Sequence, residues 1–90
     1  MNRKAAHILL IDDDPAVLDM VHSALAHYGM EVHAYPNAAE ALDLMQNPSA
    51  PQFDLVITDI NMEGLDGFDV IHKVKAMQPR LPVVLMSSQD

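Results

Sequence analysis

Acidic side chains follow two short apolar stretches of this 90-residue chain. Three consecutive aspartates, Asp12 to Asp14, come directly after the run Ile8 to Ile11, and Asp59 comes directly after Leu55 to Thr58. Each run has the length and composition of a buried strand. If the two strands are parallel neighbours, their carboxylates meet at the edge of the sheet where ligands bind in open α/β folds.

Carboxylates brought so close together repel one another, and their pKa values rise unless a cation lies among them. No Lys or Arg occurs between Lys4 and Lys73, whereas 12 of the 13 acidic residues fall in that interval. A hard divalent cation with oxygen ligands would compensate this charge, and Mg²⁺ is the natural choice. The acidic residues therefore predict a magnesium site.

Strand and helix signals alternate along the chain and predict the order β-α-β-α-β-α-β. Strands are expected over residues 7–12, 31–35, 53–59 and 81–86. Three helices are expected to start at the N-caps Asp14, Asn37 and Asp66. This order favours an α/β fold with a parallel sheet and helices on both faces.

Apolar residues at three-to-four spacing predict which helix faces pack against the sheet. In the first helix these residues are Val17, Val21, Leu25 and Tyr28, and in the third they are Phe68, Ile71 and Val74, with Lys75 beside them. Several methionines, Met20 among them, are also expected in the core rather than on a binding surface.

The last apolar run, from Leu81 to Met86, is apolar on both faces, yet no further strand signal follows it before Asp90. An exposed apolar edge promotes association with other strands. We therefore expect that the chain is a fragment or that a second copy covers this edge in a homodimer.

Composition limits the classes of partner. The formal charge of −8 argues against direct binding of nucleic acid or an anionic membrane by this segment. The chain has no Cys for a disulfide or thiolate site, and no apolar run approaches the roughly 20 residues that cross a bilayer. Its five histidines show no pair at zinc-like spacing beside a third ligand, so we expect them at the surface or its boundary. Cytoplasmic residence is expected.

Three motifs together point to a family: ILLIDDDP, ITDINMEGLDG and VVLMSS. In combination and spacing, they resemble the CheY-like receiver domain of two-component response regulators. The resemblance covers nearly the whole chain and implies a flavodoxin-like (βα)₅ fold of which helix four, strand five and helix five are missing. Residues 1–90 are thus expected to form the N-terminal three-quarters of a receiver domain.

The resemblance also implies roles for single residues. Asp59 corresponds to the phosphoacceptor, which takes a phosphoryl group from a sensor histidine kinase or a phosphotransfer protein. Asp13 and Asp59 would bind Mg²⁺ directly, Asp12 would act through water, and Asn61 would offer its backbone carbonyl. Ser87 would hydrogen-bond the phosphoryl group and act in the switch. Such a domain is a signalling switch and does not turn over an external substrate.

The chain departs from the family pattern in ways that keep two alternatives open. Glu63 stands where the family often has Pro, and the family's Lys and switch aromatic after strand four have no counterpart. One alternative is a degenerate receiver that binds partners without being phosphorylated. The other is a haloacid-dehalogenase-type phosphatase with Asp12 as its nucleophile, although that class leaves the Asp59 turn unexplained.

Overall fold

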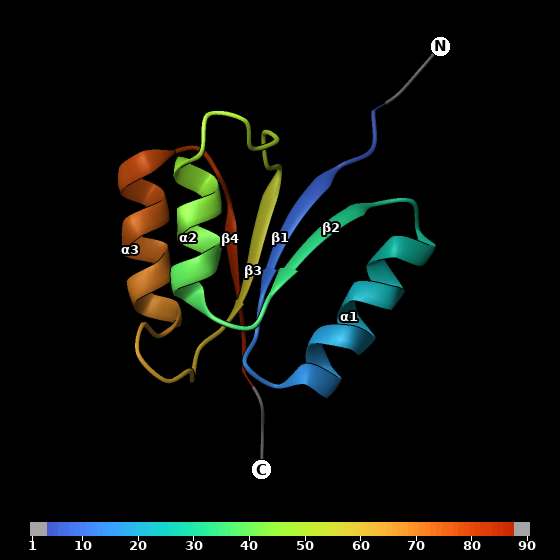
Figure 1. The fold of residues 1–90 in the computed structure, drawn as a ribbon, viewed down its shortest axis with the longest axis horizontal. Helices are drawn as coiled ribbons and strands as arrows, with labels where there is room; N and C mark the ends of the chain where they lie inside the picture. Colours follow the sequence, from blue (N-terminus) through green and yellow to red (C-terminus); the bar gives the residue numbers. More distant parts are fainter. Residues whose placement is uncertain (1–3, 88–90) are drawn as a thin grey trace.

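The computed structural model describes residues 4–87, which form four strands and three helices (Figure 1). In chain order they are β1 (His7–Ile11), α1 (Pro15–His27), β2 (Glu31–Tyr35), α2 (Ala38–Gln46), β3 (Leu55–Asp59), α3 (Gly67–Met77) and β4 (Val83–Met86). The predicted order is confirmed. The main differences are in β3 and β4, which each start two residues later than expected, because residues 53–54 and 81–82 belong to the preceding loops.

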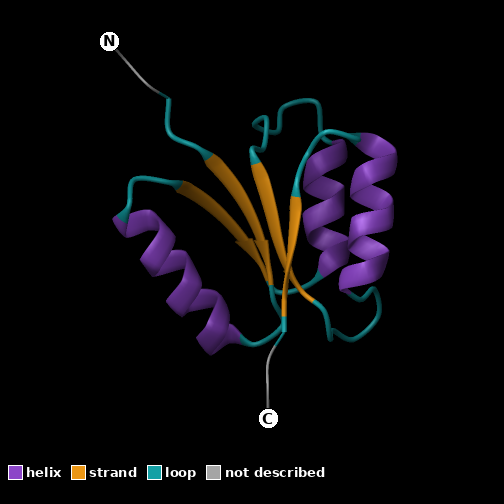
Figure 2. Cartoon of the chain, turned by 180° about the vertical axis from the view of Figure 1, so that it is seen from behind, coloured by secondary structure: helices purple, strands orange, loops and turns teal. Residues whose placement is uncertain are grey.

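All four strands are parallel and lie in one sheet in the order β2-β1-β3-β4. Figures 1 and 2 show α1 on one face of this sheet and α2 with α3 on the other. The predicted parallel α/β fold with helices on both faces is therefore confirmed. Because β1 and β3 are direct neighbours, with Ile11 opposite Thr58, the residues that follow these strands emerge side by side.

The three helices begin at the predicted caps. Side-chain oxygens of Asp14, Asn37 and Asp66 accept hydrogen bonds from the backbone N–H groups of Ala16, Glu40 and Asp69, each at 2.9 Å. Each bond satisfies a donor that a helix start leaves without an intrahelical partner. None of the helices described has the length and apolarity that crossing a membrane requires.

The main core lies between the sheet and the pair α2 and α3. Its fully buried members include Leu9, Ile11, Val56, Val70 and Val74. Helix α1, by contrast, has no buried residue, although it packs on β1 and β2. The expected core positions of Tyr28, which is 79% exposed, and of Met20 are therefore wrong. The reason is that α1 has no helix beside it within residues 4–87 and contacts the sheet along one side only (Figure 2).

Helix α3 is rotated relative to the predicted face. Its buried residues are Gly67, Val70 and Val74, whereas Phe68 is largely exposed. The expectation that Phe68 shares the core face is thus wrong. Helix α3 packs against both the sheet and α2, and its close contact through Gly67 sets which residues face inward.

Strand β4 lies at an edge of the sheet. Within the described part of the chain it pairs with β3 and with no other strand, and its Val84 side chain is 47% exposed. The predicted apolar strand at an open edge is confirmed for these residues. Coverage of that edge by a second copy stays a prediction.

Candidate functional site

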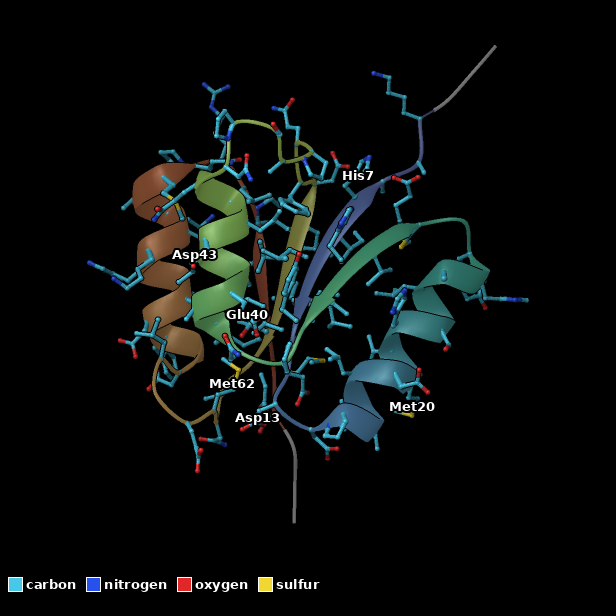
Figure 3. The ribbon with its side chains drawn as sticks, in the orientation of Figure 1. His7, Asp13, Met20, Glu40, Asp43 and Met62 are labelled. Atoms are coloured by element: carbon cyan, nitrogen blue, oxygen red, sulfur yellow. The ribbon has the colours of Figure 1, made fainter. Side chains whose placement is uncertain are left out.

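Three carboxylates meet at the carboxyl end of the sheet. Asp12 and Asp13 directly follow β1, and Asp59 is the last residue of the neighbouring strand β3. One carboxylate oxygen from each residue lies within 4.8 Å of the oxygens of the other two. Figure 3 shows Asp13 at this end of the sheet, below the last residues of the strands. Residues 46 positions apart in the sequence are therefore close enough to share one ion.

Burial differs among the three acids. Asp12 is 3% exposed and Asp59 is 6% exposed, whereas Asp13 is open to solvent. Burial raises the pKa of Asp12, and the nearby charges of Asp59, Asp13 and Asp14 raise it further. The hydrogen bond that Asp12 Oδ1 accepts from the backbone N–H of Asp14, at 2.9 Å, opposes this rise. The site thus holds negative charge that its hydrogen bonds only partly compensate.

A pocket of about 390 Å³ surrounds these acids. Its lining includes Asn61 and Ser87, both exposed, so the structure brings every predicted site residue to one place. The backbone N–H of Asn61 donates to Asp59 Oδ1 at 3.3 Å. Asp14 also lines the pocket, but its side chain caps α1. Ser88, the last residue of the third motif, lies outside the described residues.

Gly67 supports the site in a way that the sequence motifs do not reveal. A Cβ on this residue would lie 2.7 Å from the carbonyl oxygen of Asp59 and 2.8 Å from Ile60 Cα. The backbone N–H of Gly67 also donates to the carbonyl of Ile60 at 2.9 Å. Glycine is therefore needed for the start of α3 to pack against the end of β3. Gly67 is the last residue of the motif ITDINMEGLDG, but the motif alone does not show this steric role.

Replacing Gly67 with Ala should destabilise the domain by about 1 to 3 kcal/mol, because the contacting atoms are backbone and cannot rotate away. Urea denaturation measures the free energy of unfolding. Gly64→Asn is the comparison for backbone strain without a clash, since Gly64 has φ +80 but open space around its Cβ position. A Gly67→Ala variant as stable as the wild type would contradict the steric account.

The raised pKa of Asp12 predicts how stability changes with pH. Above the ordinary value of 3.8, Asp12 binds more protons in the folded chain than in the unfolded chain, so stability falls as the pH rises through the range between the two pKa values. Asp12→Asn should remove this effect and stabilise the metal-free domain at pH 7, with no gain below pH 3.8. Urea denaturation in EDTA from below pH 3.8 to pH 7 measures the free energy of unfolding, with the exposed Asp43→Asn as control. An equal gain in stability at both pH values would contradict the linkage.

Comparison with known proteins identifies the family. The family model for the response regulator receiver domain matches residues 8–90. The chain therefore belongs to the response regulator receiver domain family of two-component systems. Receiver domains of this family generally accept phosphoryl groups, bind Mg²⁺ through acidic residues and act as signalling switches.

Two curated relatives show the extent of sequence similarity. The DNA-binding transcriptional regulator NtrC from Bradyrhizobium sp. is 41% identical over 86 residues, which cover 96% of this chain and 17% of that protein. The transcriptional regulatory protein GlrR from Escherichia coli is 33% identical over 88 residues, which cover 98% of this chain and 19% of that protein. The chain thus spans about a fifth of the length of these relatives.

Solved structures agree with the fold. The chemotaxis protein CheY4 from Vibrio cholerae superposes with a TM-score of 0.87 at 27% identity, covering 97% of this chain and 72% of that one. The response regulator TrrA from Thermotoga maritima, solved in complex with Mg²⁺-BeF, gives a TM-score of 0.82 at 27% identity and covers 94% of this chain and 71% of that one. The predicted CheY-like, flavodoxin-like fold is confirmed.

Proposed function

We propose that this chain accepts a phosphoryl group on Asp59 from a sensor histidine kinase or a phosphotransfer protein, in a Mg²⁺-dependent reaction. The observation that carries the proposal is the group of Asp12, Asp13 and Asp59 around one pocket at the carboxyl ends of β1 and β3. We also propose that residues 1–90 correspond to the N-terminal part of a receiver domain and act in the cytoplasm as a signalling switch.

The donor set fits Mg²⁺, because the ion prefers oxygen ligands and the cluster offers three carboxylates with uncompensated charge. Asp13 and Asp59 would hold the ion through their carboxylates, Asn61 through its backbone carbonyl and Asp12 through water. When bound, the ion neutralises negative charge on the phosphoryl oxygens, which is the main requirement of phosphoryl transfer.

Asp59 is the proposed nucleophile. Its Oδ1 accepts a hydrogen bond from Asn61, which orients the carboxylate and leaves Oδ2 for attack. An oxygen of Asp59 bonds to phosphorus as the bond between phosphorus and the donor's imidazole nitrogen breaks, and the imidazole leaves with that electron pair. The product is an acyl phosphate on Asp59 and a free histidine on the donor.

Ser87 is the residue that we propose to contact the phosphoryl group on Asp59. Asp59 pairs in register with Met86 of β4, and the N–H of Ile60 donates to the carbonyl of Met86 at 3.0 Å. Ser87 follows Met86 directly and lines the same pocket as Asp59. A hydrogen bond from its hydroxyl to the phosphoryl group would pull the end of β4 toward Asp59, converting the modification into a change of conformation.

Acetyl phosphate and Mg²⁺ test the proposal directly. Intact-mass spectrometry should detect one added phosphoryl group, and tandem spectrometry should localise it to Asp59. EDTA should prevent the modification. Continuous release of phosphate that depends on Asp12 would instead support the phosphatase alternative. Neither modification nor release, in a chain shown to be folded, would support a degenerate receiver.

A further inference from the structure

A second cluster of potential ligands lies at the opposite end of the sheet from the acidic pocket. His7 is the first residue of β1, Glu31 is its register partner on β2, and His33 lies two residues further along β2. One ligand atom from each residue lies within 4.8 Å of those of the other two. Figure 3 shows His7 at the amino-terminal end of the sheet, well separated from Asp13.

Sequence spacing does not reveal this cluster, because His7 and His33 are 26 residues apart and meet only through strand pairing. Both are half-buried, as expected for boundary residues. They are not isolated, however, because strand pairing brings both of them beside Glu31.

The separation of the two imidazoles suits a tetrahedral metal site. His7 Nδ1 and His33 Nε2 are 3.2 Å apart. Glu31 Oε2 lies 3.2 Å from His7 Nε2, the other nitrogen of that ring, so Glu31 has to turn toward Nδ1 to share one ion with both rings. Ligands at about 2.0 to 2.1 Å from a tetrahedral Zn²⁺ lie about 3.3 Å from one another. The Glu31 side chain is 60% exposed, so it can turn to complete the coordination with little disturbance.

Neighbouring residues order the ring of His33 and the backbone of His7. The ring of Phe53 packs edge-on against the ring of His33, with centroids 5.3 Å apart. Asp54 Oδ2 accepts a hydrogen bond from the backbone N–H of His7 at 2.8 Å, which anchors the start of β1. Such partners reduce the ordering that metal binding would otherwise require.

An ion can reach the cluster from solvent. His7 lines a pocket together with Lys4 and Asp54, and the side chain of Glu31 is 60% exposed.

We propose that His7, Glu31 and His33 form a Zn²⁺ site that joins β1 to β2 and is separate from the acidic pocket. Two imidazoles and one carboxylate are a typical ligand set for Zn²⁺, with water in the fourth position. Mg²⁺ prefers oxygen ligands and a more regular octahedron, so it should bind the acidic pocket instead.

The test is calorimetric titration of the whole chain with ZnCl₂ in excess Mg²⁺, which occupies the acidic pocket. His7→Gln and His33→Gln should each weaken Zn²⁺ binding at least tenfold. His72→Gln is the matched control, because His72 is an exposed histidine on α3, and it should leave the affinity unchanged. Zn²⁺ should also raise the Tm of the wild type and not that of His7→Gln.

Glu31→Gln keeps the test decisive if loss of a half-buried ring disturbs folding, since Glu31 is largely exposed. This variant should bind Zn²⁺ several-fold more weakly with unchanged Mg²⁺ affinity, and NMR should show Zn²⁺ shifting the ring resonances of His7 and His33. The proposal is overturned if Mg²⁺ displaces the Zn²⁺, if His72→Gln weakens binding as much as His7→Gln does, or if all three cluster variants bind as the wild type does.

Discussion

Asp59→Asn should abolish phosphorylation by acetyl phosphate, a loss on the order of a hundredfold or more in intact-mass measurements. The amide of Asn does not attack phosphorus, so the nucleophile is removed. The change is nearly isosteric, and the Asn side-chain oxygen can still accept the hydrogen bond that Asn61 donates to Asp59 Oδ1. The variant should therefore stay folded, which separates the loss of chemistry from a loss of structure.

Asp43→Asn is the matched control for this prediction. Asp43 is an exposed residue of α2 whose side chain Figure 3 shows away from the carboxyl end of the sheet, and the change of charge is the same. It should be phosphorylated as the wild type is. If Asp59→Asn still gained a phosphoryl group while Asp12→Asn did not, Asp12 would be the nucleophile and the assignment of Asp59 would be incorrect.

Asp13→Asn should lower the affinity for Mg²⁺ at least tenfold, which corresponds to about 1.4 kcal/mol of binding free energy. Asp13 is one of three carboxylates within reach of a shared ion, and removing its charge weakens the attraction for a divalent cation. Asp13 is exposed, so the substitution should change the free energy of unfolding little. NMR titration with MgCl₂ measures the affinity.

Asp14→Asn provides the comparison for Mg²⁺ binding, because Asp14 lines the same pocket and carries the same charge. Its Oδ1 accepts the hydrogen bond from the N–H of Ala16 that begins α1, and Asn serves equally well as an N-cap. We expect its Mg²⁺ affinity to stay within about threefold of the wild type, since the Asp14 side chain caps α1 and contributes its charge alone. If Asp14→Asn bound Mg²⁺ more weakly than Asp13→Asn, Asp14 and not Asp13 would be the ligand.

Local signals were enough to predict the elements and the three acids of the pocket, whereas Asn61 and Ser87 were predicted from the resemblance to the family. The caps Asp14, Asn37 and Asp66 are read within a few residues of the helices that they begin, and short apolar runs mark the strands. In a parallel sheet all carboxyl ends lie at one edge, so the position of an acid after a strand already indicates where it will be. Asp13 and Asp59 were thus expected together before any distance was known.

Side-chain environments that depend on contacts between distant segments were not predictable in this way. The exposure of Tyr28 follows from the absence of another helix beside α1 within residues 4–87. The burial of Val70 in place of Phe68 follows from how Gly67 docks α3 against β3. The pairing of His7 with His33 depends on the register between β1 and β2. Helical periodicity identifies an apolar side of a helix, but only packing in three dimensions selects the residues that become buried and the side chains that meet.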